Sequence, residues 1–173
     1  MMFNKHKSKI AATVLSILTL VFMTPTLSSN VMDYVVQKQV AESYNKQVEC
    51  LAKNIYYESG SETYEGKLAV AQVTLNRVNS PKYPHEVCAV VYQKTQNTCQ
   101  FSWTCNNTDT TVRNKYQWEE SLLIAKRALT QPVLHDIIAK TNALYYHANY
   151  VNPGWNKTKV VARIGNHIFY ANI

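Results

Sequence analysis

Residues 64–78, YEGKLAVAQVTLNRV, carry the clearest helical pattern in this chain of 173 residues. Apolar side chains recur there every three or four positions, which places them on one side of a helix. The stripe consists of Leu68, Ala71, Leu75 and Val78. The break Ser59-Gly60-Ser61 precedes this segment and Pro81 follows it. The pattern predicts an amphipathic helix that packs its apolar side against a core.

Further helices are predicted on both sides of this one. Apolar residues recur at helical intervals in residues 49–57 and again in residues 115–130, where Pro132 ends the pattern. Residues 86–92 form a shorter apolar run that suits a brief buried helix. These segments predict a helical first part of the domain.

The C-terminal third has a different pattern. Residues 143–147, 160–164 and 167–170 are rich in aromatic and β-branched side chains, which is typical of strands. Gly165-Asn166 separates the last two and suits a type II′ hairpin turn. Helices followed by a small antiparallel sheet predict the α+β class.

The N-terminus has the pattern of an export signal. Lys5, Lys7 and Lys9 precede the apolar residues 10–23, and Pro25 follows them. This stretch is short for a membrane span of roughly 20 residues. We expect residues 1–28 to be a signal peptide or an N-terminal membrane anchor in the inner membrane, and both remain open. Residues 29–48 are then a linker or marginal helix, and residues 49–173 a catalytic domain exported to the periplasm or cell envelope.

The charge argues against a nucleic-acid partner. The formal net charge is +7, and removing the three lysines of the leader leaves +4. No run of basic residues alternates with aromatic ones, as a nucleic-acid surface would require. A monomer that binds an envelope polymer fits this balance better.

Four cysteines lie beyond the leader, in a chain expected to reach an oxidising compartment. Three pairings of the four cysteines are possible. We favour Cys99–Cys105, which closes a short loop, together with Cys50–Cys88, which ties two helices. A zinc site would need a CxxC pair or closely spaced histidines, and neither occurs. A catalytic thiol paired with His147 or His167 is the other alternative.

Glu58 is the most informative single residue. It ends the apolar, aromatic run Asn54-Ile55-Tyr56-Tyr57, just before the break at Gly60. Such surroundings solvate a charged carboxylate poorly, so the pKa of this carboxyl should rise and the group should hold a proton near neutral pH. A glutamate at a helix end is more often a solvated or capping residue, so the position alone does not decide its role.

Several segments in order resemble the SleB/CwlJ-type cell-wall hydrolases. They include NIYYE (54–58), EGKLAVAQV (65–73), LNRV (75–78), QFSW (100–103), NALYY (142–146) and IGNHIF (164–169). The resemblance runs from Cys50 to Tyr170. It implies a lysozyme-like or lytic-transglycosylase-like fold, peptidoglycan as the substrate and Glu58 as the catalytic acid. One departure is Gly60, where the family's motif has an arginine.

The reaction implied is cleavage of the β-1,4 bond between N-acetylmuramic acid and N-acetylglucosamine. A hydrolase needs a second carboxylate roughly 5–9.5 Å from the first. The sequence offers Glu62, Glu65, Asp109 and Asp136, none in surroundings that favour this role. We therefore favour a lytic transglycosylase, in which Glu58 acts as both acid and base, over a muramidase-type hydrolase.

Other residues are candidates for binding the substrate, because rings and hydrogen-bonding groups alternate in their segments. They are Gln100, Phe101, Ser102, Tyr145, Tyr146, His147 and Trp155. Glu62 is a supporting residue. No metal or cofactor is expected. An N-acetylmuramoyl-L-alanine amidase and a non-catalytic wall-binding module are the competing functions, and a role in cell-wall remodelling or in phage lysis, as an endolysin, stays open.

Overall fold

The structure is a computed structural model. It describes the backbone of residues 4–96, 98–105, 109–131, 137–155 and 158–172, and side chains from residue 29 onward apart from residues 137, 139 and 158. The chain divides into two compact units, residues 1–43 and 44–173. Asp136 and the side chains of residues 1–28, including the apolar segment 10–23, lie outside the described residues.

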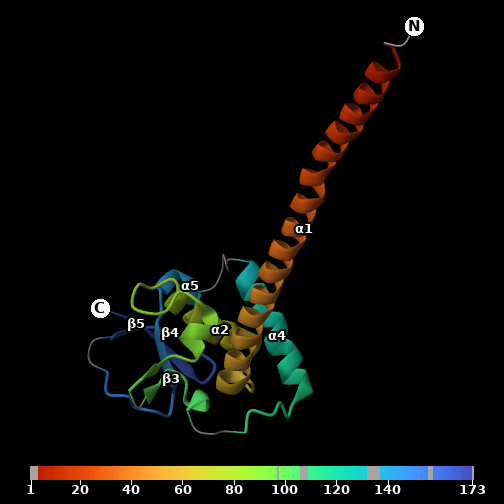
Figure 1. The fold of residues 1–173 in the computed structure, drawn as a ribbon. Helices are drawn as coiled ribbons and strands as arrows, with labels where there is room; N and C mark the ends of the chain where they lie inside the picture. The colour runs from red at the N-terminus through yellow and green to blue at the C-terminus, as the bar shows by residue number, and fades with distance from the viewer. Residues whose placement is uncertain (1–3, 97, 106–108, 132–136, 156–157, 173) are drawn as a thin grey trace. The chain divides into compact units, whose positions relative to one another are not determined.

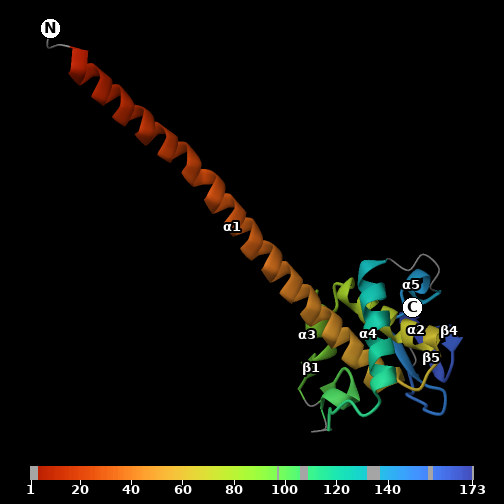
Figure 2. The ribbon, with the colours of Figure 1, turned by 90° about the vertical axis from the view of Figure 1, so that its right-hand side faces the viewer.

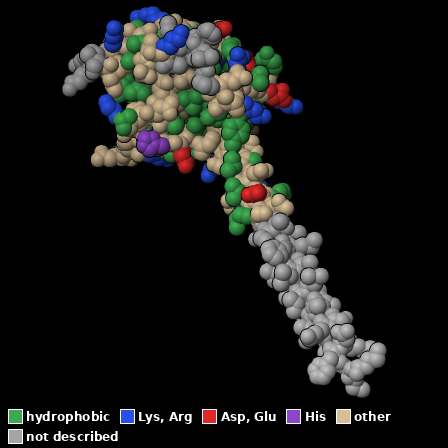
Figure 3. Space-filling model, turned by 90° about the horizontal axis from the view of Figure 1, so that it is seen from above, with side chains coloured by type: hydrophobic (Ala, Val, Ile, Leu, Met, Phe, Trp, Pro, Cys, Tyr) green, Lys and Arg blue, Asp and Glu red, His purple; other side chains and the backbone are tan. Residues whose placement is uncertain are grey.

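The described backbone of the first unit, residues 4–43, is helical. Helix α1 runs from Asn4 to Ser59 and so continues into the second unit. Residues 29–48, predicted to be a linker or marginal helix, are helical within α1. Large apolar side chains are exposed along residues 31–40 and appear in green in Figure 3. Among the residues that the structure describes, no helix is both long enough and apolar enough to span a membrane.

The helices of the second unit follow the sequence pattern closely. Helix α2 spans Tyr64–Val78 and α4 spans Lys115–Thr130, as predicted. The shorter helices are α3 (Val87–Val91), a 3-10 turn η1 (Ser102–Thr104) and α5 (Ile137–Thr141). Side chains cap the two long helices at their N-termini. Thr63 accepts from the Gly66 amide at 3.3 Å, and Asn114 accepts from the Gln117 amide at 3.1 Å.

The sheet has three antiparallel strands in the order β3-β5-β4. Their bounds are Tyr145–Ala148, His167–Asn172 and Thr158–Ile164 respectively. Tyr146 lies opposite Phe169, and His147 opposite Ile168. Gly165, in the turn between β4 and β5, has a φ of +56°, the conformation expected at the first position of a type II′ turn. A smaller antiparallel pair joins β1 (Lys94–Thr95) and β2 (Thr98–Cys99).

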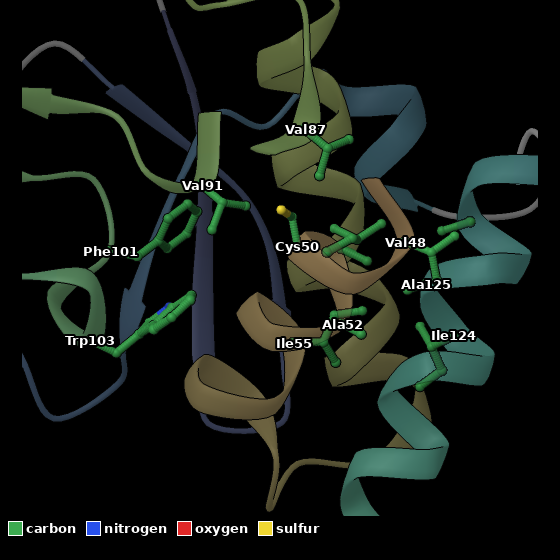
Figure 4. Packing of buried hydrophobic residues seen from close by; sticks show 13 residues of the cluster. Val48, Cys50, Ala52, Ile55, Val87, Val91, Phe101, Trp103, Ile124 and Ala125 are labelled. Carbon is green, nitrogen blue, oxygen red and sulfur yellow. The ribbon is translucent and has the colours of Figure 1, made fainter. Parts of the chain in front are cut away.

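Helix α2 is the centre of the second unit. It contacts α4 on one side and strand β4 on another, and Figures 1 and 2 both draw it between α4 and the sheet. The main core gathers the end of α1, α2, α3 and α4 around residues that are almost fully buried: Leu51, Ala52, Ile55, Ala71, Val91 and Ile124. In Figure 4, Phe101 and Trp103 reach this core from one side, and Ile124 and Ala125 from the other. A second cluster lies between α2, α5 and the sheet around Phe169.

Both predicted disulfides are present in the structure. Cys50–Cys88 joins the last part of α1 to α3, and Cys99–Cys105 closes the loop that contains η1. No cysteine is free. The alternative of a catalytic thiol therefore loses its candidates, because a disulfide sulfur is not a thiolate nucleophile.

Candidate functional site

Glu58 lies in the last turn of α1, where the helix ends against the sheet. Its carboxyl group is half-buried, and Oε2 accepts a hydrogen bond from the Tyr146 hydroxyl at 3.0 Å. Tyr146 stands on β3 and packs its ring against Phe169, at 5.7 Å between centroids, and against His167, at 5.2 Å. The acid and the tyrosine are far apart in the sequence, and the junction of α1 with the sheet brings them together.

The surroundings of this pair raise the pKa of both groups. Burial raises the pKa of Glu58, while the Tyr146 hydrogen bond and the charge of Arg77 oppose that rise. Burial, with the neighbouring Glu58, holds the pKa of Tyr146 well above its usual value. Tyr146 therefore remains a hydrogen-bond donor, and Glu58 is suited to carry a proton toward a substrate oxygen.

Arg77 is the cation of the site. It is 5% exposed, and its Nε donates to the Leu144 carbonyl at 2.8 Å. The guanidinium carbon lies 5.4 Å from the Tyr83 ring centre and 5.1 Å from that of Phe101, distances suited to cation–π contacts. Its Nη1 is buried without a hydrogen-bond partner among the described residues. The sequence pattern predicted that Arg77 lies near the end of helix α2, but it did not predict the contacts with these two rings.

Glu62 has a structural partner. Its two carboxylate oxygens accept from Asn166, Oε2 from the backbone amide at 3.0 Å and Oε1 from the side-chain amide at 2.9 Å. The contact fastens the β4–β5 turn to the loop after Glu58. A Cβ on Gly165 would collide with Glu62 Oε2, so the turn needs glycine for this contact as well as for its φ.

Several other carboxylates of the second unit are paired with cations. Glu120 pairs with the buried Lys67, and Glu49 pairs with Lys53 at 2.8 Å. Hydrogen bonds from Thr111 and then Arg113 lower the pKa of Asp109. Glu65 is exposed in the first turn of α2. Within the described ranges, no hydrogen bond or charge interaction links a second carboxylate to Glu58.

Gly60 stands where the family's motif has an arginine, and the structure gives a reason for it. A Cβ at this position would lie 2.5 Å from the backbone oxygen of Tyr56. The chain turns tightly against the last turn of α1 here, and any side chain would have to move the backbone. The close turn of this loop therefore explains why glycine stands at position 60 in place of the arginine of the family's motif.

The loop of Gln100, Phe101 and Ser102 contains both buried and solvent-exposed residues. Phe101 is 3% exposed and packs in the core beside Arg77, whereas Ser102 is exposed and Gln100 is half-buried. The backbone amide of Gln100 donates to the Gln93 carbonyl at 3.1 Å. Of the three predicted substrate contacts, Ser102 and Gln100 are accessible from outside.

The remaining predicted contacts lie on the face of the sheet opposite Tyr146, because neighbouring residues of a strand alternate sides. Trp155, 42% exposed, lies 5.7 Å from Tyr145, 5.6 Å from His147 and 5.5 Å from Tyr170, between ring centres. His147 Nε2 and the Tyr170 hydroxyl are 2.7 Å apart and hydrogen-bonded. The residues predicted to contact sugar therefore lie in two separate groups, one in the loop of Gln100 and Ser102 and one around Trp155.

The described part of the chain has no cluster of metal-ligating side chains. Among the described residues, no three side chains of His, Cys, Asp or Glu form a group that could hold an ion. Burial lowers the pKa of His167, whose ring lies edge-on to Tyr146. This histidine is a neutral packing partner of Tyr146 at neutral pH.

The comparisons with known proteins fit this architecture. A family model described as Cell Wall Hydrolase matches residues 61–170. The chain belongs to this cell wall hydrolase family. The predicted family is thereby confirmed, although the matched region begins just after Glu58, so the role of that residue depends on its geometry.

Individual relatives of this family member are spore cortex-lytic enzymes. That of Oceanobacillus iheyensis is 30% identical over 133 residues, 75% of this chain and 44% of the relative. That of Bacillus subtilis strain 168 is 43% identical over 49 residues, 28% of this chain and 16% of the relative. The chain thus spans less than half the length of these relatives.

A solved structure supports the fold. The catalytic domain of the Bacillus cereus SleB protein superposes with a TM-score of 0.54 at 26% identity, and the match covers 73% of this chain and 91% of that domain. The predicted α+β fold of the lysozyme-like kind is confirmed by this likeness and by the order of the elements.

Proposed function

We propose that the protein cleaves the glycan strands of peptidoglycan between N-acetylmuramic acid and N-acetylglucosamine, as a lytic transglycosylase. Membership of the cell wall hydrolase family and similarity to spore cortex-lytic enzymes support a wall polymer as substrate. The observation that carries the proposal is the half-buried carboxyl of Glu58, with its raised pKa and its hydrogen bond from Tyr146.

The reaction needs one group that first gives and then takes a proton. The Glu58 carboxyl donates its proton to the bridging oxygen as the bond from that oxygen to C1 of the muramic residue breaks. The carboxylate left behind removes the proton from the C6 hydroxyl of the same residue while that oxygen bonds to C1. The products are a free hydroxyl on N-acetylglucosamine and a 1,6-anhydro muramic end, and Glu58 is protonated again.

Among the described residues, no second carboxylate interacts with Glu58, and this favours the transglycosylase route over hydrolysis. Both oxygens of Glu62 accept from Asn166, and the described carboxylates of Glu49, Asp109 and Glu120 are paired with cations. A retaining or inverting hydrolase would need one of them near the bond as nucleophile or base. The C6 hydroxyl, in contrast, comes with the substrate.

The glycan strand of the substrate would lie along the junction of α1 and the sheet. Tyr146 fixes Glu58, while Gln100 and Ser102 offer hydrogen-bonding groups to the amide-bearing sugars. Trp155, Tyr145 and His147 form an aromatic surface on the face of the sheet opposite Tyr146. This surface is suited to stacking on a sugar ring further along the glycan strand. Export to the periplasm or cell envelope is part of the proposal, and the leader pattern and the two disulfides support it.

Digestion of purified peptidoglycan tests the proposal. The soluble fragments are identified by mass spectrometry after incubation with the full chain. Anhydro-muramic ends are expected. New reducing ends would show a hydrolase instead, and free stem peptides without glycan fragments would show an amidase and overturn the proposal. Intact polymer would leave wall binding as the function.

A further inference from the structure

A separate pocket of about 280 Å³ opens beside the disulfide-closed loop. Its lining includes two lysines, two aromatic residues and two threonines: Lys53, Lys94, Tyr92, Trp103, Thr104 and Thr110. Cations beside aromatic rings are a combination that suits an anionic group attached to an organic chain.

The aromatic wall of this pocket is held in place. The indole nitrogen of Trp103 donates to Asn54 Oδ1 at 3.0 Å, and the Asn54 amide donates to Thr74 Oγ1 at 3.1 Å. Asn54 and Thr74 are fully buried. Tyr57 stacks on the indole at 4.7 Å between centroids. A ligand would therefore meet a wall that needs no reorganisation.

The pocket has a surplus positive charge. Lys53 is paired with Glu49 at 2.8 Å, and the hydrogen bond that Lys53 donates to Glu49 raises the pKa of Lys53. The nearby acid Asp109 is paired with Arg113 at 2.8 Å. Lys94 is exposed, and no carboxylate of the described chain pairs with it. Lys94 is thus the cation available to a ligand.

Residues next to the pocket connect its wall to the Glu58 site. Tyr57, which stacks on the pocket wall, directly precedes Glu58 in α1. Phe101, in the same loop as Trp103, contacts the Arg77 guanidinium, and Arg77 acts electrostatically on Glu58. A substrate bound at Glu58 could therefore extend a substituent past this loop.

We propose that this pocket binds a carboxylate of the peptide stem carried by the muramic residue of the strand, so that the enzyme prefers peptide-bearing glycan. This inference rests on the proposed glycan cleavage and adds a specificity subsite to it. A stem of five residues reaches at most about 17 Å when extended, enough to cross from the sugar to a neighbouring pocket. The stem carboxylates are anions on an organic chain, and Lys94 supplies the matching charge.

Three forms of one peptidoglycan test the subsite. The first carries its stem peptides, the second has the peptide carboxyl groups converted to amides, and the third has been stripped of peptides by an amidase. Initial rates of glycan-fragment release are measured for the full chain, for Lys94→Gln and for the control Lys126→Gln, which changes an exposed lysine on α4.

We expect the wild-type rate to fall about fivefold on the amidated and stripped forms, as for loss of one partly exposed ion pair. Lys94→Gln should show the same loss on the peptide-bearing form only, and Lys126→Gln should match wild type. The subsite is overturned if Lys94→Gln matches the control on all three forms, or if it slows all three equally. If wild type releases no fragments from any form, the proposed glycan cleavage itself fails.

Discussion

The Tyr146 hydroxyl donates to Oε2 of Glu58 across 3.0 Å and thereby joins strand β3 to the end of helix α1. This bond holds the carboxyl in a fixed orientation at the boundary of the helical part and the sheet. It also favours the ionised form and so limits the rise in pKa that burial causes. A group that alternates between acid and base needs such a balance, because either form held too strongly would stop one half of the reaction.

The first prediction concerns Glu58 itself. Glu58→Gln should retain the fold and the Tyr146 contact but lose activity by roughly 10²–10⁴-fold, the usual contribution of a general acid or base. Glu65→Gln, at an exposed position in α2, is the matched control and should keep its activity. Fragment release from peptidoglycan measures both. Equal losses in the two variants would remove Glu58 from the catalytic role.

The same substitution has a consequence for stability. The folded chain binds the Glu58 proton more tightly than the unfolded chain, because its folded-state pKa is raised. Its contribution to the free energy of unfolding therefore falls as pH rises from the unfolded pKa of about 4.3 through the folded pKa. Glu58→Gln should unfold at a higher temperature than wild type at pH 7, with a smaller difference near pH 4. Thermal melts at the two pH values check this.

Tyr146→Phe tests the hydrogen bond. Its loss should raise the pKa of Glu58 further, since the bond now lowers it. Activity that needs protonated Glu58 falls as pH rises through this pKa, so the alkaline limb of the pH–rate profile should move to higher pH. The maximal rate should also fall, by about tenfold, as the carboxyl loses its orientation.

Tyr64→Phe is the control for this profile, because the Tyr64 hydroxyl bonds Arg127 at 3.1 Å. Its alkaline limb should coincide with that of wild type. An unmoved limb in Tyr146→Phe would mean that the bond does not tune Glu58 in solution.

The two disulfides should contribute unequally to stability. Chain entropy predicts about 4 kcal/mol for Cys50–Cys88, whose cysteines are 38 positions apart, and about 2 kcal/mol for Cys99–Cys105, 6 positions apart. Urea unfolding of the two double-alanine variants measures the difference. A larger loss from the short loop would contradict the entropic account and point to strain or packing at that loop.

Gly60→Ala tests the close turn after Glu58. The new methyl group would meet the Tyr56 carbonyl oxygen at 2.5 Å, so the loop must shift, at a cost of about 1–3 kcal/mol. Ser61→Ala, at the exposed neighbouring position, should change stability by less than about 0.5 kcal/mol. Urea unfolding compares them. Wild-type stability in Gly60→Ala would show that the turn is looser than its geometry indicates.

Much of the fold could be predicted because its determinants are local. The apolar spacing in residues 64–78 and 115–130 specified α2 and α4, and Gly165-Asn166 specified a hairpin turn. Disulfide bonds were expected from four cysteines in a chain predicted to be exported, and the favoured one of three possible pairings is the one in the structure.

The site was less predictable, because long-range packing decides it. Strand alternation showed that Tyr145 and Tyr146 face opposite sides, but only the docking of α1 on the sheet shows which of them meets Glu58. Phe101 was predicted to contact sugar, and it lies in the core beside Arg77. The Glu62–Asn166 contact joins residues 104 positions apart, and no local pattern indicates it.

Digestion in oxygen-18 water most directly tests whether Glu58 acts without a partner acid. Transglycosylation forms the new bond at C1 from the muramic C6 oxygen, so the fragments should carry anhydro ends without heavy oxygen. Glu58→Gln should give neither product. Reducing ends that contain the heavy isotope would show that water captures the sugar, and would contradict the single-acid account.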